Sequence, residues 1–91
     1  EGAAVLGLSL ALFGNITASE GRIVQGNYHD YEMLRIHQTP ETHIEVVQSE
    51  DLPTGIGEPG VPVIAPALIN AIFDATGKRF RSLPLKAHGL I

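Results

Sequence analysis

Apolar residues dominate Ala3 to Phe13 and leave no polar face on the helix that this stretch predicts. A helix that is apolar all round is typical of a position inside a larger protein rather than on the surface of a small domain. Gly14 and Asn15 then provide a helix end. Because the chain also begins at Glu1 without a methionine or an entry segment, we expect it to be a piece of a longer protein.

Two β-prone runs follow at residues 16–18 and 22–25, separated by Ser19-Glu20-Gly21, a connection typical of a hairpin. Residues 26–41 have no regular period and predict an ordered loop. Residues 42–48 alternate apolar and polar side chains over most of their length, which predicts a strand with one buried face.

A second helix is predicted to begin at Ala65-Pro66, because proline is tolerated in a first turn, and to end at Gly77. Its apolar stripe is Leu68, Ile69, Ile72 and Phe73. Residues 49–62 form a long predicted loop, and residues 80–91 carry no strong signal. The fold class is therefore α+β, as one unit over residues 1–91.

Glu58 stands in the run Gly55-Ile56-Gly57-Glu58-Pro59-Gly60, where glycine and proline disfavour regular structure. Gly57 leaves room for a ligand or another backbone, and the apolar run at residues 61–66 would raise the proton affinity of a neighbouring carboxylate. This arrangement is typical of a general base. A solvated glutamate in a surface turn remains an equally good interpretation of the local sequence.

Composition excludes several classes of function. With 91 residues, a formal net charge of −4 and only six Lys and Arg residues, the chain has no extended basic stripe for nucleic acid. It has no cysteine, hence no disulfide, thiolate zinc site or iron–sulfur ligand of its own. Ala3 to Phe13, taken as the longest apolar stretch, is too short for a membrane span. The four histidines, His29, His37, His43 and His88, lack metal-site spacing, so no metal ligand is predicted.

Five motifs together carry a family resemblance: Glu-Gly-Ala at 1–3, Gly-Leu-Ser at 7–9, Asn-Tyr-His-Asp-Tyr at 27–31, Pro-Thr-Gly-Ile-Gly-Glu-Pro-Gly at 53–60 and Ala-Pro-Ala-Leu-Ile-Asn-Ala-Ile-Phe at 65–73. In this order they resemble the xanthine dehydrogenase and aldehyde oxidase family. The likeness covers residues 1 to about 85 and is strongest to the C-terminal end of the molybdopterin-binding large subunit of bacterial isoquinoline 1-oxidoreductase and related aldehyde dehydrogenases.

The resemblance implies hydroxylation of an N-heterocycle, or oxidation of an aldehyde, with oxygen derived from water. It implies that the chain is part of a larger α/β molybdopterin-binding domain. It also implies a molybdenum–molybdopterin cofactor, expected as the cytosine dinucleotide, and electron transfer through iron–sulfur clusters. By motif match Glu58 is the general base. Gly57 is a candidate for lining the cofactor cavity, although a simple turn glycine is at least as good an interpretation. The pterin-contacting glutamine of the family would precede Glu1, so no pterin ligand is assigned.

The expected partners are the rest of the large subunit, a small iron–sulfur subunit and a small-molecule substrate. We expect the isolated chain to bind no cofactor, to be inactive and to form oligomers. Cytoplasm and periplasm of a bacterium both remain open as locations. The alternative is a stand-alone α+β binding or assembly module whose Gly/Pro loop docks a partner, and in that case Glu58 would lie hydrated on a convex surface above a closed core. In the enzyme, Glu58 is instead expected to line a cavity left open where missing segments belong.

Overall fold

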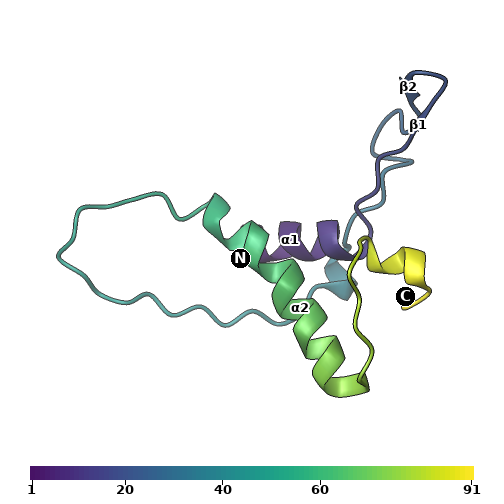
Figure 1. Cartoon of the computed structure of the whole chain (residues 1–91). Coiled ribbons are helices and arrows are strands. Elements are labelled where there is room, and N and C mark those ends of the chain that lie inside the picture. The colour runs from purple at the N-terminus through teal and green to yellow at the C-terminus, as the bar shows by residue number, and fades with distance from the viewer.

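The computed structural model describes all 91 residues and shows an open, elongated molecule (Figure 1). Its radius of gyration is 15.9 Å, whereas a compact domain of this length has about 12 Å. Only five of the 91 residues are buried, namely Gly7, Ser9, Ala11, Phe13 and Leu85. The core is therefore small and lies where the N-terminal helix meets two later segments.

The centre of the molecule is a crossing of two helices, α1 (Gly2–Leu12) and α2 (Val61–Thr76) (Figure 1). Gly7 is buried at the crossing, where a Cβ atom would lie 2.8 Å from both the Val61 carbonyl oxygen and the Ile64 Cβ. Only glycine permits such a close approach of the two backbones. The predicted first helix is thus confirmed within one residue at each end, and Gly7 of the Gly-Leu-Ser motif has a packing role.

The second helix begins earlier than the sequence predicted. A 3₁₀ turn, η2 (Glu58–Gly60), runs directly into α2 at Val61, so the loop predicted to extend to residue 62 ends at Gly57. Proline at positions 59 and 62 is compatible with this because the first helical N–H groups have no intrahelical partner. Pro66, predicted to start the helix, lies inside it. The predicted end is confirmed, since Gly77 is left-handed (φ 73°) and its N–H bonds the Phe73 carbonyl at 2.7 Å.

The predicted hairpin is confirmed as a short antiparallel pair, β1 (Ala18–Ser19) and β2 (Arg22–Ile23). Its connection has two residues, Glu20 and Gly21, with φ of 51° and 74°. Positive φ at both positions is the geometry of a tight hairpin turn. The hairpin projects away from the helices (Figure 1), and all four strand residues are exposed.

The strand predicted at residues 42–48 does not form in this structure. Residues 39–57, here called the extended loop, contain neither helix nor strand and leave the helical body as a wide loop (Figure 1). The alternating pattern is present, but a strand also needs a neighbour to accept and donate its backbone hydrogen bonds. No such neighbour lies beside residues 42–48, and the only sheet has two strands.

The C-terminal segment closes the core, although its residues carry no strong sequence signal. It forms the turn η3 (Leu85–His88), in which Leu85 is the largest fully buried side chain. The connection between the hairpin and the extended loop also contacts the core, because the Leu34 N–H donates to the buried Ser9 Oγ at 3.0 Å and a short turn, η1 (Ile36–Gln38), follows. The α+β class is thereby confirmed.

One helical stretch, Glu58–Thr76, has 19 residues and is long and apolar enough to cross a membrane by length and composition. The prediction of no membrane span considered Ala3 to Phe13 and overlooked this stretch. Core helices of water-soluble proteins have the same length and composition, so these properties alone assign no span.

Candidate functional site

Glu58 is the first residue of η2, at the point where the extended loop joins the α2 helix. Its side chain is exposed, makes no hydrogen bond or ion pair with the rest of the chain, and lines none of the three cavities of the structure. The apolar run at 61–66 forms the first turns of α2, and Val61, Ile64 and Ala65 are half-buried. This chain by itself therefore does not surround Glu58 with apolar groups.

Gly57 precedes Glu58 in an ordinary right-handed conformation (φ −71°, ψ −64°). A Cβ atom built on Gly57 would meet no other group within 4 Å. The backbone here does not require glycine for its own conformation, so this geometry gives no support to the turn-glycine interpretation. It leaves open space in which a bulky group could approach the backbone, and the cofactor-lining role of Gly57 stays a prediction.

Helix packing brings together two of the motifs that are far apart in the sequence. A Cβ atom at Gly60 would lie 2.9 Å from the Ala3 Cβ, so η2 rests against the first turn of α1. The Glu-Gly-Ala motif at 1–3 and the Gly-Glu-Pro-Gly run at 57–60 thus meet at one end of the α1–α2 crossing. Glycine at 60 is needed for this contact, because any side chain would push η2 away from α1.

An apolar cleft of about 490 Å³ runs along the same end of α1. Its lining comprises Glu1, Gly2, Val5, Leu6, Ser9, Met33 and Leu34. The cleft therefore joins the Glu-Gly-Ala motif to the segment after the hairpin, and it is open to solvent. It does not include Glu58.

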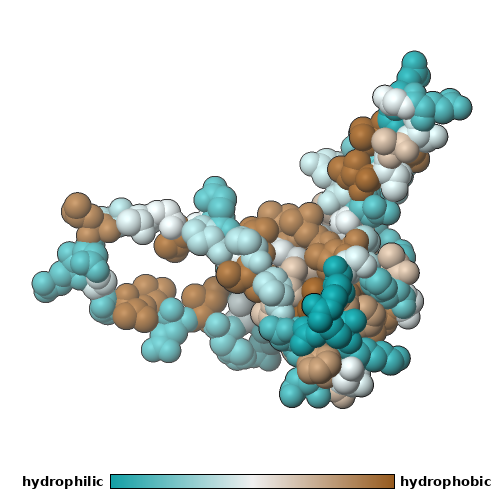
Figure 2. Space-filling model, viewed as in Figure 1, coloured by the Kyte–Doolittle hydropathy of each residue, from teal (hydrophilic) through white to brown (hydrophobic).

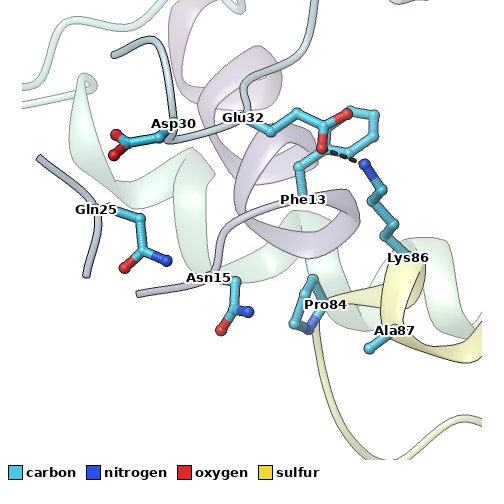
Figure 3. A pocket seen from close by; sticks show the side chains of 8 residues that line it. All are labelled: Phe13, Asn15, Gln25, Asp30, Glu32, Pro84, Lys86 and Ala87. Carbon is cyan, nitrogen blue, oxygen red and sulfur yellow. Dashed lines mark hydrogen bonds and ion pairs between the residues drawn. The ribbon is translucent and has the colours of Figure 1, made fainter. Parts of the chain in front are cut away.

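A second, polar cavity of about 290 Å³ lies between the end of α1 and η3 (Figure 3). Figure 3 shows the side chains of Phe13, Asn15, Gln25, Asp30, Glu32, Pro84, Lys86 and Ala87 around it. The Lys86 ammonium forms an ion pair with Glu32 and lies 5.9 Å from the Phe13 ring. These contacts attach η3 to the end of α1 and to the segment around Glu32. The residues around this cavity therefore hold the fold together.

The Asn-Tyr-His-Asp-Tyr motif forms a tight turn that is organised by one carboxylate. Asp30 accepts hydrogen bonds from the Gly26 N–H at 2.8 Å and the Asn27 N–H at 3.0 Å. These two backbone donors, with a smaller contribution from nearby His29, hold the pKa of Asp30 below its ordinary value of 3.8. The His29 Nε2 atom is 3.7 Å from Asp30, beyond hydrogen-bond distance. The motif therefore has a structural role in this turn.

The histidines are scattered over the molecule, and no group of three or more His, Asp or Glu side chains comes together that could hold a metal ion. His88 contacts Ser82 and lies 5.1 Å from the Phe80 ring. His43 Nε2 lies 3.2 Å from the Glu41 carboxylate in the extended loop. Both contacts are local.

The enzyme interpretation expects Glu58 to line an open cavity, whereas in this structure Glu58 is exposed and lines none. Comparison with known proteins tests the family resemblance independently of this geometry. No protein-family profile matches the chain. Individual curated proteins do match, and four of them carry the names of dehydrogenases or oxidoreductases. These matches confirm the resemblance of the chain to the xanthine dehydrogenase and aldehyde oxidase family.

Over 94% of this chain, it is 48% identical to a membrane-bound aldehyde dehydrogenase (pyrroloquinoline-quinone) of Gluconacetobacter polyoxogenes and 38% identical to the isoquinoline 1-oxidoreductase β subunit of Brevundimonas diminuta. It is also 30% identical, over its whole length, to a probable xanthine dehydrogenase subunit of Bacillus subtilis. The chain spans only 11 to 13% of the length of these relatives.

Proposed function

We propose that this chain is the C-terminal part of the large subunit of a molybdenum hydroxylase, which oxidises an aldehyde or hydroxylates an N-heterocycle, and that Glu58 is its general base. The observation that carries the proposal is the meeting of the Glu-Gly-Ala and Gly-Glu-Pro-Gly motifs at the α1–α2 crossing. An active site built from both motifs would require them to lie close together in the fold, as they do here. The low burial supports a position within a larger domain.

The proposed cofactor is molybdopterin with molybdenum, as the xanthine dehydrogenase and isoquinoline oxidoreductase relatives imply. Its cytosine dinucleotide form rests on the family resemblance alone and is part of the proposal. The residues present fit such a group, because Gly57 leaves open space beside the exposed Glu58 carboxylate. When bound, the cofactor supplies the two-electron oxidant for the reaction. Gly57 would lie against it, and no residue of this chain is assigned as a pterin ligand.

The role of Glu58 is to accept a proton from the water-derived hydroxyl group that becomes part of the product. A general base must reach its proton directly or through one water molecule. Glu58 is suited to this because no other group of the chain occupies its carboxylate. The α2 helix fixes the backbone directly after it, since η2 is held against α1 at Gly60. The remaining walls of the site would come from the rest of the subunit.

The substrate class follows from the relatives. Their names specify an aldehyde, isoquinoline, xanthine and, in a 31% identical protein of Pseudomonas putida, nicotinate. Three of these four are N-heterocycles. We therefore propose that the substrate is an aldehyde or an N-heterocycle. The proposed electron acceptor is a small iron–sulfur subunit, and the proposed location is the cytoplasm or periplasm of a bacterium.

A second cofactor has one observation in its favour. The name of the Gluconacetobacter polyoxogenes relative specifies pyrroloquinoline quinone and a membrane-bound enzyme. Metal analysis together with extraction of the cofactor from the purified enzyme distinguishes molybdopterin from pyrroloquinoline quinone. Molybdenum and a pterin would support the proposed cofactor, and a quinone without molybdenum would show that the cofactor is pyrroloquinoline quinone.

The test of the proposed function is Glu58→Gln in the full enzyme, with Glu50→Gln as the matched control. Glu50 is an exposed glutamate of the extended loop with no partner. We expect Glu58→Gln to keep its molybdenum content and lose turnover by at least roughly 100-fold, the scale of general-base loss. The control should retain full turnover. Unchanged turnover in Glu58→Gln would remove Glu58 from catalysis.

The intact mass of the native gene product tests whether these residues belong to a longer subunit. A large molybdenum-containing subunit supports the proposal. A metal-free product no longer than these 91 residues would favour the stand-alone binding module instead.

A further inference from the structure

Residues 42–48 have the side-chain pattern of a strand but no strand partner in this structure. Thr42, Ile44 and Val46 fall on one face of an extended chain, and His43, Glu45 and Val47 fall on the other. Ile44 and Val46 are 59% and 76% exposed. The face that the pattern assigns to a protein interior thus lies in solvent, which a folded protein ordinarily avoids.

The backbone of the segment is also unpaired. None of the backbone hydrogen bonds between loop residues involves residues 42–48, and no helix or strand includes them. The side chains of Glu41 and His43 approach to 3.2 Å, as residues two apart do when they share one face of an extended chain. An extended segment with free N–H and C=O groups is able to join the edge of a sheet.

We propose that residues 42–48 form a β-strand by pairing with an extended segment from another part of the same subunit. The inference rests on the proposed function in one respect, that the chain belongs to a longer subunit. The curated relatives align over 94% of this chain, which includes residues 42–48, and have most of their length outside the matched part. A partner strand within the same polypeptide is therefore available.

Two other partners for residues 42–48 can be considered, a second copy of this chain and the chain's own hairpin; charge argues against the first and distance against the second. Residues 41–51 carry four acidic side chains, Glu41, Glu45, Glu50 and Asp51, and no Lys or Arg. Pairing with a second copy would set these acids against one another, and like charges on neighbouring strands are destabilising. The chain's own hairpin projects from the opposite end of the molecule (Figure 1). The partner should therefore be an extended segment with alternating apolar side chains and with Lys or Arg near the acids.

Because the extended loop has no partner, apolar side chains along it are uncovered, as Figure 2 shows for the thin loop on the left. Pairing would cover one face of that loop. It would also hold the chain on the N-terminal side of Glu58, while α2 holds it on the C-terminal side. The short stretch of residues 49–57 between these two anchors would then position Gly57 and Glu58.

Hydrogen–deuterium exchange in the full-length subunit and in the isolated 91-residue chain tests the strand. We expect the amides of residues 42–48 to exchange at least roughly 100-fold more slowly in the full subunit, well within the range of paired strands. Residues 51–56 serve as an internal reference and should exchange rapidly in both samples.

A pair of variants in the full subunit sharpens the result. Val46→Pro removes a backbone donor in the centre of the proposed strand and should abolish the protection of residues 42–48. Leu52→Pro is the matched control, because Leu52 is 89% exposed in the same loop but outside the strand. The control should leave the protection intact.

Rapid exchange of residues 42–48 in a full subunit that contains molybdenum and depends on Glu58 would overturn the strand and leave the proposed function in place. Protection that appears in the isolated chain and rises with its concentration would also overturn the proposal, in favour of pairing with a second copy. A native product with only these residues would instead defeat the proposed function, and its intact mass reveals that case separately.

Discussion

The α1–α2 crossing and the extended loop of residues 39–57 both contain large apolar side chains and two or more glycines, yet only the crossing is packed. At the crossing, Gly7 and Gly60 bring backbones together at distances that exclude a side chain. In the loop, Gly55 and Gly57 have nothing within 4 Å of a built Cβ. Glycine composition therefore does not distinguish a tight contact from an open one.

The difference between the two regions is whether the chain contains the opposing surface. The α1 helix finds α2, η2 and η3 within these 91 residues, and these contacts bury the five core positions. The extended loop finds none, and Val46, Val47 and Leu52 are each at least 76% exposed. A structureless segment of this length is uncommon inside a compact domain, which is why the loop is the part we expect to change most in a larger assembly.

The largest effect on this contrast should come from Leu85→Ala, compared with Leu52→Ala as its control. Leu85 is fully buried and Leu52 is 89% exposed, so the same substitution creates a cavity only in the core. We expect Leu85→Ala to lower the free energy of unfolding by about 2–5 kcal/mol. The control should change it by less than about 0.5 kcal/mol. Urea unfolding followed by circular dichroism measures both, and equal losses would show that the core assigned to Leu85 is wrong.

Gly7→Ala against Gly55→Ala tests the same contrast with a single methyl group. At Gly7 the new methyl would meet the Val61 carbonyl and the Ile64 side chain at 2.8 Å, and the carbonyl belongs to a helix backbone that cannot move freely. We expect a loss of about 1–3 kcal/mol in the free energy of unfolding, as for other overpacked sites. Gly55→Ala should be neutral or stabilise by up to about 1 kcal/mol.

The same urea titration measures the Gly7 pair. A Gly7→Ala variant as stable as the parent would mean that α1 and α2 are farther apart at Gly7 than described.

The elements that sequence reasoning predicted well are those with local signals. Gly77 ends α2 through its own left-handed conformation, and Glu20-Gly21 sets the hairpin through positive φ. The start of α2 was placed too late because Pro66 was taken as a first-turn residue, whereas Pro59 and Pro62 already occupy that role. Prolines mark several possible starts, and packing decides among them.

The features that sequence reasoning missed depend on contacts between distant residues. Leu85 lies in a tail without periodicity, and its burial follows from the position of α1. The strand at residues 42–48 was predicted from its pattern, but pairing needs a partner outside the pattern. For Glu58 the motif identified the residue, while the surroundings that would make it a base involve groups beyond its own neighbours. Its catalytic role therefore remains a proposal.

The turn at residues 26–30 is the intermediate case between the packed crossing and the open loop. It has no apolar core, yet the Asp30 carboxylate orders it through the Gly26 and Asn27 N–H groups. The same donors hold the pKa of Asp30 below 3.8. A group whose folded pKa is lowered stabilises the fold above its unfolded pKa, and this contribution disappears as pH falls through the folded value.

We therefore expect the turn to be intact above pH 3.8 and to loosen as the solution becomes more acid than that. This effect should be the smallest of the three, because the turn is exposed and screened by solvent. NMR titration of the Asp30 carboxyl carbon, with the Gly26 and Asn27 amide shifts, measures it directly. The amide shifts should follow the carboxyl titration, and Asp30→Asn should remove their pH dependence. A midpoint at or above 3.8 would show that Asp30 does not hold the turn, which would then be as open as the extended loop.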